Sequence, residues 1–237
     1  MVKKIKELHC LCCTEAFRSF FSKLTPEDLH TVQLQKVVRQ YKKGFKIFFE
    51  GNKPNGVYCV KSGHIKLFKH GSYGREHITR LAFPGEFIGL KALLTGTTYS
   101  VSAQALEDSV LCFIGKTEFF QLTLRYPEFS SALIAYLSKQ LVDAEEKMIS
   151  LAHRPVRERL ASVLLYLYEH FLLPSVSPEN AYLNLARKDL ADMVGTAPET
   201  VIRLLAEWKE KKIVSIKGRK IFIHNETDLK KISGCFS

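Results

Sequence analysis

The strongest constraint on the fold lies between Leu183 and His224, where two short helical patterns meet at a glycine. Gly195 ends the first pattern and turns the chain. Pro198 opens the second, where a first helical turn tolerates it because the missing N–H would have been unpaired anyway. The apolar residues recur at helical spacing: Leu190, Ala191, Met193 and Val194, then Val201, Leu204, Leu205 and Trp208. We therefore predict two short helices packed across a tight turn.

The second predicted helix carries Glu199, Ile202 and Arg203 on its other face. The following segment, Ile213–His224, has β-branched runs on both sides of a glycine and predicts a hairpin, or wing. Two helices, a tight turn and a wing are typical of a winged helix-turn-helix, which reads DNA. The alternative is an ordinary helical hairpin. The basic flank that follows Arg203 favours DNA, because Lys and Arg neutralise phosphates.

Composition bounds the remaining possibilities. The 237 residues are enough for two domains, and 46% hydrophobic with 25% charged residues is typical of a globular protein. The net charge of +11 favours a polyanionic partner. No apolar run is long enough to span a bilayer, and the charged start lacks a signal-peptide core. We expect a cytoplasmic protein without membrane association, whose six cysteines are thiols or metal ligands rather than structural disulfides.

Between about Gly44 and Ile114 the pattern changes to short β-rich runs cut by glycines. Closely spaced short strands with glycine turns indicate a sandwich, barrel or jelly roll. The predicted strands are Lys46–Phe49, Gly56–Lys61, His64–Lys69, His77–Phe83, Tyr99–Ala105 and Ser109–Ile114. A short helical lead-in, Cys10–Thr31, is expected before them.

A long helix is predicted from Phe129 to Leu151, followed by a break at Pro155, a helix over Leu160–Leu173 and a loop over Pro174–Asn180. The long helix has a narrow apolar seam with alternating three-four spacing: Ile134, Leu137, Leu141, Ala144, Met148 and Leu151. We predict a parallel dimer coiled coil, because a two-fold dimer lets a helix-turn-helix protein span two half-sites. Packing of the seam on the barrel of the same chain is the alternative.

These parts, in this order, resemble the CRP/FNR family of bacterial transcription regulators over almost the whole chain. The resemblance rests on Tyr58–Leu67, on Pro84–Gly89 and on Pro198–Leu205. It implies an α+β fold: a sensor domain over residues 1–125, with a cyclic-nucleotide-binding-type jelly roll at about 40–115, a dimerisation helix over 126–152, and a winged helix-turn-helix over 153–237. A DNA-reading transcription regulator is the function implied, and a non-DNA-binding scaffold of the same type is the rival. No catalytic motif stands out, so we expect no enzyme.

The resemblance also implies which residues contact DNA. Those predicted are Lys188, Thr196, Glu199, Thr200, Ile202, Arg203, Lys217 and Arg219. In the family, the positions of Glu199 and Arg203 read a TGA-type core, so we expect a palindrome of TGA-containing half-sites about one helical turn apart. Ile202 replaces the small residue usual there. RNA polymerase is a further partner if the regulator activates transcription.

Cyclic AMP is not expected as the effector. In cyclic-AMP-binding members, a Glu after Phe-Ile-Gly binds the ribose and an Arg-Ser pair holds the phosphate. Here those positions are Leu90 and Tyr99 beside Ser100. Lys91 and Arg80 are cations that could substitute, but nothing in the sequence requires it.

The FNR branch fits better, since Ser102–Cys112 resembles it and Cys112 falls at the internal cluster cysteine of that branch. Cys10, Cys12 and Cys13 lie in roughly the place of its other ligands, so the resemblance implies an iron–sulfur cluster on four thiolates. The spacing departs from the branch, which spreads these ligands more widely. A thiol–disulfide switch within Cys10–Cys13, a haem, a small-molecule effector and the absence of any effector stay open. Haem would need an axial ligand such as His9, His64 or His77.

Overall fold

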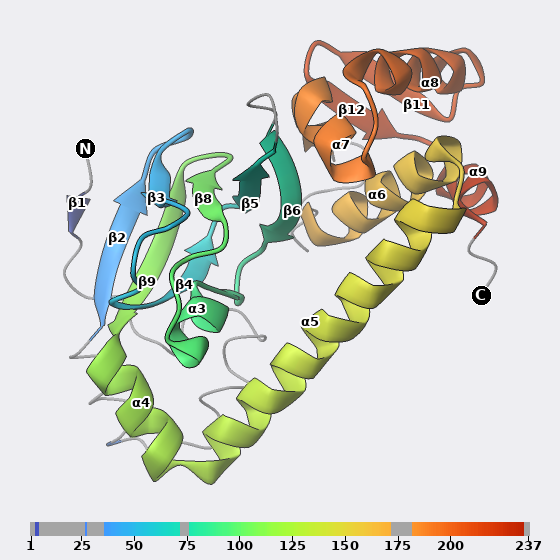
Figure 1. Ribbon diagram of the computed structural model, residues 1–237. Helices are drawn as coiled ribbons and strands as arrows, with labels where there is room; N and C mark the ends of the chain where they lie inside the picture. The colour runs from blue at the N-terminus through green and yellow to red at the C-terminus, as the bar shows by residue number, and fades with distance from the viewer. Residues whose placement is uncertain (1–2, 5–26, 28–35, 72–75, 172–181, 235–237) are drawn as a thin grey trace. The chain divides into compact units, whose positions relative to one another are not determined.

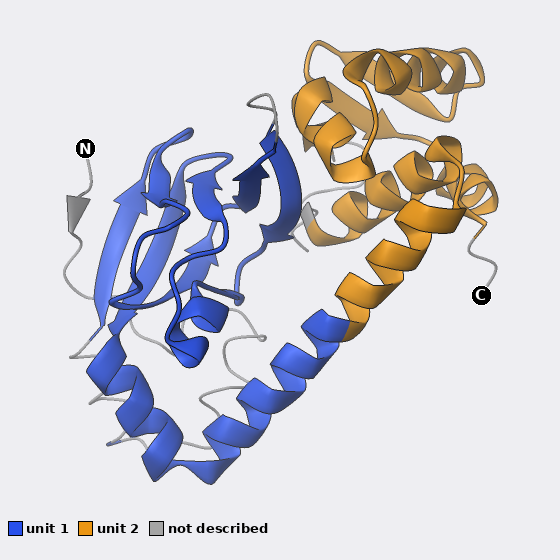
Figure 2. Cartoon of the chain, viewed as in Figure 1, with its two compact units in different colours: residues 1–141 blue, residues 142–237 orange. Residues whose placement is uncertain are grey.

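The computed structural model describes residues 3–4, 27, 36–71, 76–171 and 182–234. The chain divides into two compact units, residues 1–141 and residues 142–237 (Figure 2). The predicted lead-in helix lies outside the described residues except for residue 27, and the predicted loop over Pro174–Asn180 lies wholly outside them.

The first unit holds a β-roll of two antiparallel sheets (Figure 1). One sheet has the order β1-β2-β9-β4-β7 and the other β3-β8-β5-β6. The strands are β1 (Lys3–Lys4), β2 (Val37–Tyr41), β3 (Lys46–Phe48), β4 (Gly56–Ser62), β5 (Ile65–His70), β6 (Glu76–Ala82), β7 (Phe87–Ile88), β8 (Ser102–Ala105) and β9 (Ser109–Gly115). Each predicted strand is present. The largest difference is the start of β8, predicted at Tyr99 and observed at Ser102.

Two apolar clusters stabilise the roll, because successive side chains of a strand point to opposite faces of its sheet. The inner cluster includes Val60, Leu67 and Leu111 and joins both sheets. The outer cluster packs the five-stranded sheet against α3 (Leu90–Thr95), α4 (Lys116–Arg125) and the start of α5 (Pro127–His153). The dimerisation helix predicted from the sequence is α5, and its first turns pack on the roll.

The second unit contains the C-terminal part of α5, then α6 (Val156–Phe171), β10 (Leu183–Asn184), α7 (Arg187–Val194) and α8 (Pro198–Glu210). The strands β11 (Val214–Lys217) and β12 (Lys220–Ile223) form an antiparallel hairpin, and α9 (Glu226–Ser233) follows. The break predicted at Pro155 separates α5 from α6. The α+β class is confirmed: a β-sheet domain, a long helix and a helix-turn-helix follow one another along the chain.

Several elements were missed by the sequence reasoning: β1, β2, β7, β10, α3, α4 and α9. For α9 a signal existed, since the Asn225 side chain accepts a hydrogen bond from the Asp228 amide as a helix N-cap. By contrast, β7 spans only two residues and owes its assignment to pairing with β4.

Candidate nucleic-acid interface

The turn between α7 and α8 has the geometry that the sequence predicts. Gly195 ends α7 with a left-handed φ of 72°, and its amide donates to the Ala191 carbonyl at 2.9 Å. Only glycine adopts this backbone routinely. Pro198 stands in the first turn of α8. The two helices therefore meet across a short, fixed turn.

Helix α8 has one buried and one exposed face. Val201, Leu205 and Trp208 are fully buried against the rest of the second unit. Glu199 and Arg203, one helical turn apart, are exposed, and so is the Ile202 side chain at 53%. Glu199, Ile202 and Arg203 therefore form an exposed face of α8, opposite its buried face.

The other predicted DNA-contacting residues lie on the same unit. Lys188 in α7 and Lys217 and Arg219 in the hairpin are exposed, while Thr196 and Thr200 are half-buried. Gly218 turns the hairpin with a φ of 60°. The Arg187 guanidinium at the start of α7 donates to the Gly218 carbonyl at 3.2 Å and to the Arg219 carbonyl at 3.4 Å. This contact, which sequence reasoning missed, ties the wing to the first helix.

An ion pair joins α6 to α8. Arg157 donates two parallel hydrogen bonds to the Glu207 carboxylate, at 2.8 and 2.7 Å, and Lys211 adds a third at 2.8 Å. The hydrogen bonds from Arg157, followed by that from Lys211, lower the pKa of Glu207 to about 2. A bidentate pair fixes orientation as well as distance, so it holds α8 at a set angle to α6.

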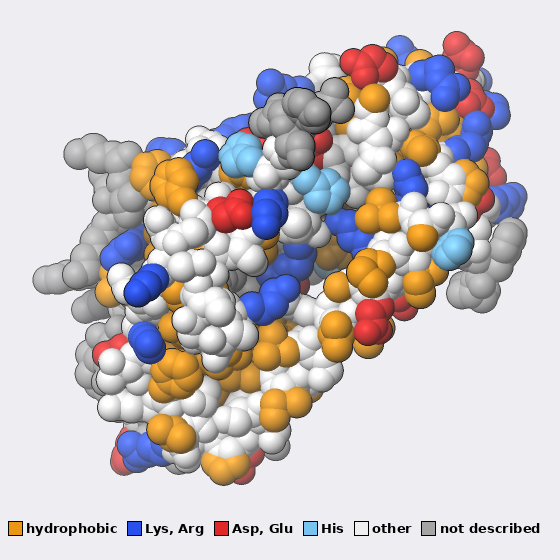
Figure 3. Space-filling model, in the orientation of Figure 1, with side chains coloured by type: hydrophobic (Ala, Val, Ile, Leu, Met, Phe, Trp, Pro, Cys, Tyr) orange, Lys and Arg blue, Asp and Glu red, His pale blue; other side chains and the backbone are white. Residues whose placement is uncertain are grey.

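Helix α5 presents an apolar stripe. Ile134, Leu141 and Met148 recur every seven residues and are 66%, 61% and 67% exposed. Figure 3 shows hydrophobic side chains along this helix. Of the remaining predicted seam residues, Ala144 and Leu151 are exposed, whereas Leu137 is partly buried against the outer cluster of its own chain. Val142 and Ile149, which the heptad reasoning omitted, are exposed at 51% and 61% and widen the stripe.

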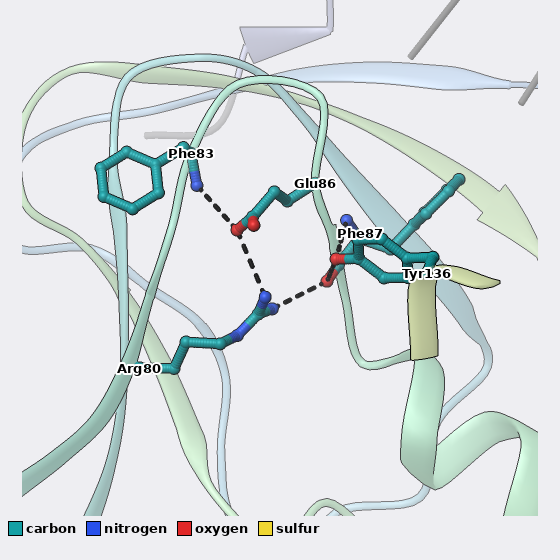
Figure 4. A network of polar contacts seen from close by, with 5 residues as sticks. All are labelled: Arg80, Phe83, Glu86, Phe87 and Tyr136. Atoms are coloured by element: carbon teal, nitrogen blue, oxygen red, sulfur yellow. Dashed lines mark hydrogen bonds and ion pairs between the residues drawn. The ribbon is translucent and has the colours of Figure 1, made fainter. Parts of the chain in front are cut away.

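A polar network attaches the N-terminal half of α5 to the roll (Figure 4). The Phe87 amide donates to the Tyr136 hydroxyl at 3.1 Å, and that hydroxyl donates to the Phe87 carbonyl at 3.3 Å. The Arg80 guanidinium reaches the same carbonyl at 3.1 Å and the Glu86 carboxylate at 3.3 Å. Glu86 also accepts from the Phe83 amide at 3.1 Å. Arg80 is therefore committed to holding β6, β7 and α5 together.

Aromatic side chains pack the inner cluster of the roll. Tyr99, predicted to stand at the position of the phosphate-binding Arg of cyclic-AMP-binding members, stacks on Phe48 with ring centroids 3.9 Å apart. Burial, and then the nearby Tyr58, raise the pKa of Tyr99, so its hydroxyl stays neutral. A Cβ on Gly89 would lie 3.1 Å from the Tyr99 ring. This ring thus packs directly on the Phe-Ile-Gly segment, and it brings no cation for a phosphate.

Only one of the predicted cluster cysteines lies in the described part of the chain. Cys112 in β9 stands directly opposite Cys59 in β4, and both thiols are buried in the outer cluster. Cys10, Cys12 and Cys13 lie outside the described residues. Among the residues that are described, no three or more His, Cys, Asp or Glu side chains group as a metal site would require.

Comparison with known proteins agrees with this architecture. Residues 38–126 match the cyclic nucleotide-binding domain, and residues 158–232 match the Crp-like helix-turn-helix domain. The chain is 30% identical to the transcriptional activator protein anr of Pseudomonas aeruginosa, over 98% of this chain and 96% of that protein. It is 27% identical to the fumarate and nitrate reduction regulatory protein of Escherichia coli, over 96% of this chain and 91% of that protein.

Solved structures show the same fold. FixK2 from Bradyrhizobium japonicum is 24% identical and superposes with a TM-score of 0.75, covering 85% of this chain and 99% of that one. A CRP/FNR family regulator from Thermus thermophilus is 25% identical, with a TM-score of 0.71 over 84% of this chain and 100% of that one. In the described parts of the chain, no helix is both long and apolar enough to cross a membrane. With both domains matched and full-length relatives of this kind, the chain belongs to the CRP/FNR family of DNA-binding transcription regulators, on its FNR branch.

Proposed function

We propose that the protein binds palindromic DNA as a homodimer, with the exposed face of α8 in the major groove of each half-site. The observation that carries this proposal is the exposed trio Glu199, Ile202 and Arg203 on a helix whose other face is fully buried. Each half-site contains a TGA-type core, and the half-sites lie about one helical turn apart. An activating role would add RNA polymerase as a partner.

Each residue of this face has a distinct role. The Arg203 guanidinium makes a bidentate contact to guanine, and Glu199 accepts a hydrogen bond from cytosine N4. Ile202 contacts a thymine methyl group next to the core. Lys188, Lys217 and Arg219, with the Thr196 and Thr200 hydroxyls, contact phosphates, which give affinity and salt dependence without sequence information.

Dimerisation is assigned to α5. The predicted seam of Ile134, Leu137, Leu141, Ala144, Met148 and Leu151 is retained, and Val142 and Ile149 join it. Burying each large apolar side chain stabilises a dimer by about 1.5–3 kcal/mol. The exposed stripe is wider than a strict a/d seam, so a partner copy has more apolar surface to cover than the seam alone supplies.

A gel-shift assay with salt titration tests the DNA-reading function. Duplexes with two inverted TGA-containing half-sites are compared with random duplexes of equal length over a range of salt concentrations. A specific regulator retains its preference for the palindrome as salt rises, because base contacts release no counterions. A scaffold would bind both duplexes weakly, and its binding to both would disappear together as salt rises.

The signal enters, in our proposal, through Cys10, Cys12, Cys13 and Cys112. Thiolates bind soft metal clusters and respond to oxidants, and four of them suffice for an iron–sulfur cluster. Cys112 supports this proposal because its thiol faces the outer cluster, on the same side of the sheet as α4 and α5. A cluster or disulfide that formed at this face would therefore lie next to the dimerisation helix.

Replacement of Cys10, Cys12 and Cys13 by Ser tests the sensor. Protein purified without oxygen is examined by ultraviolet–visible spectroscopy and iron analysis, and DNA affinity is measured before and after mild oxidation. The wild type is expected either to carry a cluster or to lose titratable thiols on oxidation, and in both cases to change its DNA affinity. The triple variant is expected to show none of these changes. Identical behaviour of the two proteins would reject the cysteine sensor in favour of a small-molecule effector or constitutive binding.

The division of the chain follows from these roles. We propose a sensor domain over residues 1–125, the dimerisation helix over 126–152 and the DNA-binding domain over 153–237, in a cytoplasmic regulator without catalytic activity. The attachment of α5 to the roll through Tyr136 supports this order of roles, since it connects the sensor to the dimer contact.

A further inference from the structure

One arginine joins the end of the dimerisation helix to the turn of the helix-turn-helix. Arg159, in α6, donates from Nη1 to the Leu151 carbonyl at 2.9 Å and to the Arg154 carbonyl at 3.3 Å. From Nη2 it donates to the Gly195 carbonyl at 3.3 Å. The first two carbonyls belong to the last turn of α5 and to the break after it, and the third belongs to the turn before α8.

These carbonyls need such a partner. The last carbonyls of a helix have no intrahelical donor, and the fork of a guanidinium can satisfy several acceptors at once. The Arg159 Nε atom is buried and makes no hydrogen bond of its own. The side chain is therefore committed to these three carbonyls through its Nη donors.

Direct packing reinforces the contact at the same place. A Cβ built on Gly195 would lie 3.0 Å from the Leu151 Cδ2 atom. The left-handed backbone of Gly195 and this close approach leave little room for the turn to move toward α5. The hydrogen bonds and the packing together make one rigid joint, formed by Arg159, Leu151 and Gly195.

We propose that Arg159 is a positioning residue that fixes the direction of the reading helix relative to the dimerisation helix, and so sets the half-site separation that the dimer reads. This rests on the proposed function, in which two copies bind two half-sites. One base pair of added separation moves a half-site by about 3.4 Å and rotates it by about 35° around the duplex. A rigid joint cannot follow that displacement, whereas a loosened joint can.

Spacing dependence of DNA affinity tests this role. A series of duplexes carries two inverted TGA-containing half-sites at about one helical turn and at one or two base pairs more or less. For the wild type we expect affinity to fall about tenfold or more per base pair away from the best spacing, a loss of about 1.4 kcal/mol per step. For Arg159→Gln we expect weaker binding at the best spacing and a nearly flat dependence on separation.

Two further variants separate positioning from stability. Arg159→Lys keeps the cation but offers a single point charge that cannot span three carbonyls, so it should also flatten the spacing dependence. It carries the test if Arg159→Gln does not fold. Asn225→Ala removes the N-cap of α9 and lowers the melting temperature of the same unit without removing any hydrogen bond of Arg159, so the spacing dependence should stay steep.

The outcomes are distinct. A wild type without any spacing preference contradicts dimeric reading itself. A wild type with a steep preference that both Arg159 variants retain overturns the positioning role and leaves the proposed function standing. A flattened dependence in Asn225→Ala as well would assign the effect to general loss of stability, which also overturns the proposal.

Discussion

At the scale of single residues, the DNA-binding unit depends on a few side chains with fixed geometry. Gly195 adopts a backbone that costs other residues about 1 kcal/mol or more, and it contacts Leu151 closely. Arg187 ties the wing to α7, and Arg157 ties α6 to α8. The buried residues of α8 fix the helix in place, so its exposed side chains have defined positions.

Arg203→Ala is expected to cost about 1–3 kcal/mol on the specific palindrome and little on random DNA, because only the specific complex uses the bidentate base contact. Fluorescence anisotropy with both duplexes at one salt concentration measures the difference. Lys217→Ala is the control, since loss of a phosphate contact weakens both complexes similarly. An equal loss on both duplexes for Arg203→Ala would make Arg203 a phosphate contact.

The Arg157–Glu207 pair predicts an acid-sensitive contribution to stability. The pKa of Glu207 in the folded protein is about 2, below its ordinary value of 4.5. The ionised Glu207 carboxylate therefore stabilises the fold fully at pH values above 4.5. The contribution is lost as pH falls from 4.5 toward 2. Melting temperatures of wild type and Glu207→Gln should therefore differ at neutral pH and converge in this acid range. A constant difference would show that Glu207 acts by packing alone.

At the scale of elements, α5 packs on the roll with one face and leaves another apolar face exposed. Leu133 and Phe129 are buried in the outer cluster, and Tyr136 bonds to the Phe87 backbone, so the first turns belong to the roll. The exposed residues from Ile134 to Ile149 leave an apolar face that a second copy can cover. The wing is held by strands and by a helix: β12 pairs with β10 and β11, and Arg187 of α7 donates to the Gly218 and Arg219 carbonyls.

Leu141→Glu is expected to convert the dimer to monomers and to weaken palindrome binding, because association would bury an unpaired charge in the middle of the stripe. Sedimentation velocity measures the mass. Leu124→Glu is the matched control, since Leu124 is 84% exposed and belongs to α4 rather than to the stripe on α5, so its replacement should leave the dimer intact. If Leu141→Glu stayed dimeric, the interface would lie elsewhere.

At the scale of the whole molecule, the roll matches the cyclic nucleotide-binding domain in fold, and the sequence predicts that it does not take cyclic AMP. Tyr99 and Phe48 stack inside it, and Arg80 is bonded to Glu86 and to the Phe87 carbonyl. The outer face of its five-stranded sheet, with Cys59 and Cys112, packs on the same helices that lead to the dimer contact. Fold and ligand are therefore separate questions here.

A ligand shifts a conformational equilibrium only when it binds the two states differently. We expect the protein not to bind cyclic AMP, so cyclic AMP should leave the DNA affinity unchanged. Anisotropy titrations of the palindrome with and without excess cyclic AMP measure this. Isothermal titration calorimetry without DNA is the complementary measurement. A saturable heat of binding, together with a change in DNA affinity, would restore the cyclic nucleotide as the effector.

Local sequence signals determined the helix-turn-helix and the wing of the DNA-binding unit. Helical spacing from Leu190 to Trp208, Gly195 at the turn and Pro198 at the start of α8 each act within a few residues, so the helix-turn-helix could be predicted without any tertiary contact. Six strands of the roll, β3, β4, β5, β6, β8 and β9, followed from short β-rich runs and glycine turns for the same reason. Pro155 likewise marked the break between α5 and α6.

Tertiary structure alone decided which faces meet. The seven-residue repeat could not show that Leu137 packs on the roll while Val142 and Ile149 stay exposed, because periodicity fixes a helix face but not the partner that covers it. Nor could sequence place Cys59 opposite Cys112, or bring Arg159 to the Gly195 carbonyl, since these contacts join residues distant along the chain. Local patterns set the elements, and long-range packing set the joints between them.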